Sequence, residues 1–302
     1  MSGLDENGDR RASRQALGDA MPGAGPAGGN SPAATPHGAP RKETLAYAEI
    51  AGVAPNLLSL DIYGVAPGSN KPVIIMIHGG GWQAGDKANR NVVDPKADHF
   101  VDEGFVFVSI NYRLAPDHPF PAHAIDAARA TAWIYENVAG YGGDPNRIAL
   151  MGHSAGAHIA ALIATDASYL RASGQDLDII DGVILLDTAA YDIPALARGP
   201  RGLPRAYRPS FGADPATWRR ASPITHVAAG KSIPPMILFH TDRRASRAAS
   251  VQFANALSEA GVVATVHAAL DRTHESLNAK IGEDGDRYTG LIDQFLASHA
   301  PG

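Results

Sequence analysis

Short apolar runs recur along the chain from residue 43 onward, and polar or helical stretches separate them. Several runs are almost continuously apolar, which is typical of strands that are covered on both faces in a parallel sheet. These runs lie at residues 72–77, 105–110, 182–187 and 235–240. Because such strands alternate with helical patterns, the chain is predicted to form an α/β domain with a mostly parallel central sheet and helices on both faces.

The remaining elements follow from their periodicity. Residues 44–50 and 57–63 alternate apolar and polar positions, which predicts two half-buried edge strands joined as a hairpin. Further predicted elements are a helix that begins near Pro121, a helix over 249–260, a strand over 262–268 and a helix over 287–299. Residues 270–278 are polar and are predicted to form a loop.

Two segments do not fit the alternation. Residues 1–42 are rich in Gly, Ala, Pro and Ser and lack apolar periodicity, so we expect a disordered tail before a catalytic domain at 43–302. The tail contains Gly23-x-Gly25-x-x-Gly28, but no strand precedes this pattern and Pro26 lies within it, so a dinucleotide site is not expected. Residues 188–232 are too long for a plain connection and are predicted to form a lid or pocket wall.

Composition narrows the class of protein. Hydrophobic residues make up 45% of the chain and charged residues 19%, which are ordinary globular values. The net charge of -5 gives no electrostatic reason to expect nucleic acid or a membrane surface as partner. There is no cysteine, no His-Glu-x-x-His pattern and no long apolar run. We therefore expect a cytoplasmic protein without a metal site, and the oligomeric state stays open.

The segment 148–162 carries the strongest chemical signal. An apolar run ends in Gly152-His153-Ser154-Ala155-Gly156, and an alanine-rich helical pattern begins at once. A Gly-x-Ser-x-Gly sequence between a strand and a helix is typical of a nucleophile elbow, in which a strained turn exposes the serine hydroxyl. The alternative is that Ser154 is an ordinary helix N-cap. We favour the elbow, with Ser154 as the nucleophile.

A serine nucleophile needs an imidazole base and a carboxylate that orients it. We favour His274 as the base, because it follows the last predicted strand in a polar loop, whereas His267 falls inside that strand. In this architecture the acid lies between the serine and the histidine in the chain. Asp242, just after the strand 235–240, is favoured, and Asp187, at the end of the preceding strand, is the alternative.

The tetrahedral intermediate of acyl transfer carries an oxyanion, which backbone N–H groups stabilise. Ala155 follows the nucleophile and would supply one N–H group. His78-Gly79-Gly80-Gly81-Trp82 directly follows a predicted buried strand, so we expect Gly80 and Gly81 to supply the others, with the N–H of Trp82 as a further candidate. The alternative interpretation of this segment is a glycine-rich surface turn.

Taken together, these motifs resemble the α/β-hydrolase carboxylesterases, in the hormone-sensitive-lipase-like and feruloyl-esterase-like branch that includes the arylformamidases. The resemblance covers roughly residues 44–300 and rests on the segments 78–82, 111–122, 143–148, 152–156 and 221–227. It departs from the family pattern at His240-Thr241-Asp242, where the spacing between the histidine and the acid is short.

The resemblance implies a Ser-Asp-His hydrolase that needs no cofactor. From it we expect a serine carboxylesterase that acts on small esters, with a short acyl or an aryl group, through an acyl-enzyme on Ser154. The nearest alternative is an arylformamidase that cleaves a formyl-anilide such as N-formylkynurenine. A non-catalytic binding protein with a hydrolase-like fold is a third possibility, but such proteins typically lose a triad residue, and candidates for all three are present here.

Overall fold

The computed structural model describes residues 42–199 and 202–299, and their strands form one sheet in the order β1-β2-β4-β3-β5-β6-β7-β8. The strands are β1 (Lys42–Ala46), β2 (Ser59–Tyr63), β3 (Lys71–Ile77), β4 (Val106–Ile110), β5 (Gly143–His153), β6 (Gly182–Leu186), β7 (Met236–His240) and β8 (Ala264–Ala268). The α-helices are α1 (Arg90–Asp102), α2 (Ala122–Asn137), α3 (Ala155–Ile163), α4 (Ser168–Arg171), α5 (Ile193–Ala197), α6 (Arg208–Phe211), α7 (Pro215–Arg220), α8 (Arg244–Glu259), α9 (His274–Lys280) and α10 (Arg287–His299).

The sheet is mostly parallel, as the apolar runs predict. β1 and β2 pair antiparallel, with Leu45 opposite Leu60, which confirms the predicted hairpin. β2 in turn pairs antiparallel with β4 and is buried along its whole length, so it is not the half-buried edge strand that was expected. From β4 to β8 every pair of neighbouring strands is parallel. The carboxyl ends of these strands therefore meet at one edge of the sheet, where open α/β sheets place their sites.

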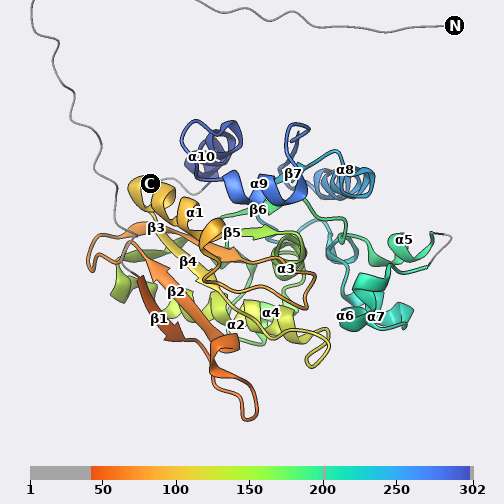
Figure 1. The fold of residues 1–302 in the computed structure, drawn as a ribbon, viewed down its shortest axis with the longest axis horizontal. Coiled ribbons are helices and arrows are strands. Elements are labelled where there is room, and N and C mark those ends of the chain that lie inside the picture. Colours follow the sequence, from red (N-terminus) through yellow and green to blue (C-terminus); the bar gives the residue numbers. More distant parts are fainter. Residues whose placement is uncertain (1–41, 200–201, 300–302) are drawn as a thin grey trace, which may run out of the picture. The chain divides into compact units, whose positions relative to one another are not determined.

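Each face of the sheet carries its own apolar core. In β3, Ile75 and Ile77 belong to one cluster, and Ile74 and Met76 belong to the other, because successive side chains of a strand point to opposite faces. The first cluster includes buried residues of α2, α3 and α8, and the second includes buried residues of α1, α9 and α10. Figure 1 shows α1, α9 and α10 along one side of the sheet and α2, α3 and α4 along the other.

Some elements differ from the sequence predictions. α1 was not predicted, and α9 replaces most of the loop expected at 270–278. Thr273 caps α9, since its hydroxyl accepts a hydrogen bond from the backbone N–H of Ser276, whose own hydroxyl bonds back to the N–H of Thr273. Such a capping box consists of polar residues that are equally common in loops, which is why the helix was missed. Its consequence is that His274 is a helix residue.

The predicted lid segment contains the short helices α5, α6 and α7, which lie together beyond one end of the sheet in Figure 1. Aromatic rings join this segment to the glycine-rich turn after β3, because the ring centroids of Tyr207 and Phe211 lie 4.9 Å and 4.8 Å from that of Trp82. Residues 1–41 of the predicted tail lie outside the described residues, and its last residue, Lys42, begins β1. Across the described ranges, no helix is long and apolar enough to span a membrane.

The glycines at 152 and 156 allow the start of α3 to pass close to the ends of β5 and β3. A Cβ on Gly156 would lie 2.0 Å from the carbonyl oxygen of Ile77, and a Cβ on Gly152 would lie 2.3 Å from that of Gly156. Both neighbours are backbone atoms, which cannot rotate away as a side chain can. The tight elbow therefore requires glycine at both positions.

Gly156→Ala should destabilise the fold by about 2 kcal/mol, the size typical of an overpacked core site. The midpoint of urea unfolding measures the change. Gly290→Ala is the matched control, because Gly290 lies inside α10 and an added Cβ there would meet nothing within 4 Å. This control should stabilise the protein slightly, since alanine favours the helix. Equal unfolding midpoints for the two variants would contradict the close approach.

Candidate active site

Ser154 lies at the turn between β5 and α3 with its backbone at φ 55° and ψ −115°. A positive φ is rare for a residue with a side chain, and it marks a strained turn of the kind found at nucleophile elbows. The Ser154 N–H donates to the carbonyl of Leu186 at the end of β6 (2.9 Å). Its side chain makes no capping hydrogen bond to α3 and is partly exposed. This geometry argues against the N-cap interpretation.

The structure pairs His274 with Asp187. His274 is the first residue of α9, and its Nδ1 donates to Asp187 Oδ2 at 2.7 Å. Asp187 directly follows β6 and is fully buried, whereas His274 is half-buried. The contact fixes which ring nitrogen faces the acid, so Nε2 remains the one that can act as base.

The prediction that Asp242 contacts His274 is therefore wrong. Asp242 is exposed, and the residue before it, Thr241, is the one that points toward the site. The Thr241 N–H and hydroxyl donate to the two oxygens of Asp187 at 3.1 Å and 2.9 Å. The loop after β7 thus supplies hydrogen-bond donors instead of the acid. The short spacing after His240 was the sequence signal for this change.

The alternative base, His267, has a packing role. It lies inside β8, as the alternation predicts, and its ring stacks on Phe239 with centroids 5.4 Å apart. Among the described residues, its ring forms no hydrogen bond or ion pair with Ser154 or Asp187.

The Asp187 carboxylate is held by donors from three segments. Besides His274 and Thr241, the hydroxyl of Ser246 in α8 donates to Oδ1. Burial alone would raise the pKa of this carboxyl, but the hydrogen bonds from His274, Ser246 and Thr241 outweigh burial and lower the pKa below its usual value. Asp187 is therefore ionised throughout the neutral range, as an orienting acid must be.

His153, the residue before the serine, connects the elbow to α9. Its Nε2 donates to the backbone carbonyl of His274 at 2.9 Å, and the two ring centroids lie 4.4 Å apart. Burial lowers the pKa of His153 to about 3, so this ring is neutral near pH 7. The contact places the first turn of α9 beside Ser154. Sequence reasoning assigned no role to His153.

The turn after β3 passes directly over the elbow. A Cβ on Gly79 would lie 3.2 Å from the Cβ of Ser154. Gly80 and Gly81 have φ values of 112° and 62°. Among the described residues, no acceptor is recorded for the N–H groups of Gly80, Gly81 or Ala155, the last of which begins α3. Free N–H groups around an exposed serine are what an oxyanion hole requires.

The segment that follows β4 supports this turn. Tyr112 is fully buried, stacks on the His78 ring with centroids 4.3 Å apart, and donates its hydroxyl hydrogen to the His78 carbonyl at 2.9 Å. Asn111 Oδ1 accepts from the N–H of Lys87 at 2.6 Å, which holds the far end of the turn. The motif at 111–122, whose residues had no assigned role, therefore contains the scaffold of the turn.

His158, four residues after the serine, also has a structural role. Its Nδ1 accepts from Trp82 Nε1 at 3.1 Å, and its Nε2 donates to the carbonyl of Ala221 at 2.7 Å. Burial lowers the pKa of His158 to about 4, so the neutral ring links the glycine turn to the lid segment.

Within the described ranges no group of three or more His, Cys, Asp or Glu residues could hold a metal ion.

Comparisons with known proteins agree with this geometry. A family model described as BD-FAE matches residues 60–180. Esterase LipQ of Mycobacterium tuberculosis is 33% identical over 250 residues, which cover 78% of this chain and 58% of LipQ. Carboxylesterase NlhH of the same organism is 47% identical over 96 residues, which cover 32% of this chain and 29% of NlhH.

Solved structures of one esterase are also similar. Thermogutta terrifontis esterase 2 phosphonylated by sarin is 25% identical with a TM-score of 0.69, covering 88% of this chain and 98% of the other. The structure of the same esterase with propionate bound is 25% identical with a TM-score of 0.66, covering 86% and 94%.

The sheet order and the serine elbow define an α/β-hydrolase. The chain therefore has the α/β-hydrolase fold and is similar to the esterases just described. The chain spans little more than half the length of LipQ.

Replacing each of the two aspartates separately by asparagine tests which one is the acid of the catalytic triad. Asp187→Asn should lower kcat/KM for an ester by up to about ten-thousandfold, because an amide cannot hold the imidazole in the productive tautomer. Asp242→Asn, the matched control on the exposed side of the loop, should stay within about twofold, since surface substitutions rarely perturb a site. Both variants are measured on p-nitrophenyl acetate after circular dichroism has confirmed their folds. A larger loss for Asp242→Asn would reinstate Asp242 as the acid.

Proposed function

We propose that this protein is a serine carboxylesterase that hydrolyses small esters, with short acyl or aryl groups, through an acyl-enzyme on Ser154. The observation that carries the proposal is the strained, partly exposed Ser154 between an Asp187–His274 pair and a turn with free N–H groups. The named esterases among the relatives support the reaction class. The structure of esterase 2 with propionate bound supports a short acyl group.

In the proposed reaction, His274 Nε2 takes the proton of the Ser154 hydroxyl as the oxygen attacks the ester carbonyl. The carbonyl oxygen becomes an oxyanion, which accepts hydrogen bonds from the N–H groups of Gly80, Gly81 and Ala155. Collapse of this intermediate breaks the bond to the alcohol, which leaves with the proton from His274. Asp187 stays ionised and stabilises the imidazolium that forms in between.

Deacylation repeats these steps with water. His274 removes a proton from the water as its oxygen attacks the acyl carbon, and the proton then passes to the leaving Ser154 oxygen. The products are the carboxylic acid and the free enzyme. Each proposed step uses only side chains and backbone groups of this chain, together with water.

Replacement of the nucleophile tests the proposal directly. Ser154→Ala should fold normally and lose nearly all hydrolysis of p-nitrophenyl acetate, apart from a residual rate that arises from the oxyanion hole and binding. The wild type should also react with a fluorophosphonate probe, and the variant should not. Labelling of both proteins alike would place the nucleophile elsewhere, and labelling of neither would favour a non-catalytic binding protein.

A substrate panel decides between an ester and a formamide. We expect kcat/KM to be highest for p-nitrophenyl acetate to butyrate and to fall for longer acyl chains, with N-formylkynurenine hydrolysed far more slowly. The measurement is kcat/KM for each compound under the same conditions. If N-formylkynurenine were the much better substrate, the protein would be an arylformamidase with the same triad.

A further inference from the structure

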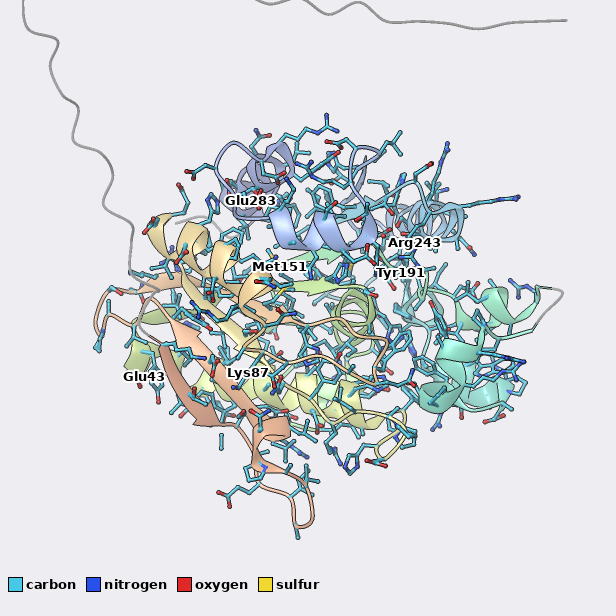
Figure 2. All side chains as sticks on the ribbon, viewed as in Figure 1. Glu43, Lys87, Met151, Tyr191, Arg243 and Glu283 are labelled. Carbon is cyan, nitrogen blue, oxygen red and sulfur yellow. The ribbon has the colours of Figure 1, made fainter. Side chains whose placement is uncertain are left out.

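A cation lies against the Asp187–His274 pair. Arg243 is in the loop between β7 and α8, and its Nη1 lies 3.1 Å from Asp187 Oδ2 and 2.8 Å from His274 Nδ1. Figure 2 labels Arg243 near the start of α8. Two cationic or potentially cationic groups thus converge on one carboxylate oxygen.

The arrangement has an electrostatic consequence. When His274 Nδ1 donates its proton to Asp187 Oδ2, the neighbouring Nη1 of Arg243 cannot also be bonded to Nδ1, because both nitrogens are donors. Their closeness costs less while the imidazole is neutral than when it carries a positive charge. Once His274 gains a proton at Nε2, the guanidinium and the imidazolium repel each other. Arg243 also offsets part of the negative charge on Asp187 that would otherwise favour the imidazolium.

We propose that Arg243 is a positioning residue that anchors the Asp187 carboxylate and, through its charge, keeps His274 in the neutral, base-competent form down to a lower pH than an Asp–His pair alone would. The expected effect on the pH dependence of catalysis rests on the proposed function, whereas the effect of Arg243 on the protonation of His274 does not. Arg243 contacts the acid and the far side of the imidazole, so it takes no part in bond making.

Other charged groups also face this pair. Glu275 follows His274 on α9, and a hydrogen bond from its own backbone lowers its pKa, so it is ionised near pH 7. Asp242 and Arg272 line the open cavity of about 620 Å³ that also exposes His274 and Arg243. Arg272 is already paired with Asp286 at 2.7 Å. None of Glu275, Asp242 and Arg272 forms a hydrogen bond with Asp187, as Arg243 does.

Further titratable groups interact electrostatically with the pair, with Arg243 or with His153. Burial raises the pKa of Tyr191, and the nearby charge of Asp187 raises it further. Burial also raises the pKa of Tyr207, although the charge of Arg243 acts in the opposite direction. Both phenols are therefore neutral near pH 7. His153 is neutral for the reason given above. Lys96 in α1 is buried, which lowers its pKa to about 7, and its charge acts on His153. Because Lys96 titrates in the same range as the proposed effect, the test must compare variants that all retain it.

The test measures the pH dependence of kcat/KM for p-nitrophenyl acetate in the wild type, Arg243→Gln and Arg243→Lys. The acidic limb of this profile reports the base in the free enzyme. Removing the cation in Arg243→Gln favours the imidazolium, so the limb should move to higher pH, by about 1 pH unit for a half-exposed neighbour. Arg243→Lys keeps the charge and should restore most of the limb's position.

Arg244→Gln is the matched control. It removes the same charge from the adjacent residue, which is exposed and makes no recorded contact with Asp187 or His274. All profiles are taken at a fixed ionic strength of about 0.15 M, so that distant charges are screened alike. The limb of this control should stay within about 0.3 pH units of the wild type. An equal shift in Arg243→Gln and Arg244→Gln, or a rate loss at every pH with an unmoved limb, would overturn the proposal.

A second readout does not depend on turnover. The imidazole Cε1–H signal of His274, assigned as the resonance missing from His274→Asn, is titrated by NMR in the wild type and in Arg243→Gln. The proposal expects its midpoint to rise by about 1 pH unit in the variant. If the protein hydrolysed no ester, the proposed function would fail while this titration still decided the role of Arg243. An unchanged midpoint would refute the proposal whatever the activity.

Discussion

The candidate site depends on one buried carboxylate. Asp187 lies at the end of β6 with no exposed surface, and an ionised carboxylate at such a position is tolerated only when donors surround it. The donors come from the loop after β7, from α8 and from the first residue of α9. Satisfying Asp187 therefore draws three segments, far apart in the sequence, to one edge of the sheet. The position of His274 follows from this requirement.

The glycine-rich turn after β3 is also held in place by hydrogen bonds to buried side chains. Its carbonyl at His78 bonds to Tyr112, and Trp82 bonds to His158 on the elbow helix. Both supporting residues are buried, so their hydrogen bonds are protected from competition by water. An oxyanion hole acts through donors that are already oriented before the reaction. In the proposed site, the buried Tyr112 and His158 side chains would hold the turn in that orientation.

Much of the fold could be predicted from local pattern. The continuously apolar runs of β3, β4 and β6 and the alternating run of β2 are strands, because burial of one or both faces leaves a direct mark on residue type. The elbow at Ser154 was predicted for a similar reason, since glycine at 152 and 156 is a local demand of close-packed backbones. α9 was missed because a capping box resembles a polar loop.

The sequence by itself determined the α/β fold, the serine at its elbow, the glycine turn and the histidine after the last strand, because each leaves a signature within a few neighbouring residues. The choice between Asp187 and Asp242 was different. Both follow a strand of the parallel sheet, and chain order allows either. Only the tertiary structure decided it, because the direction of a side chain after a strand depends on how the loop turns. Here that turn points Thr241 inward and leaves Asp242 in solvent.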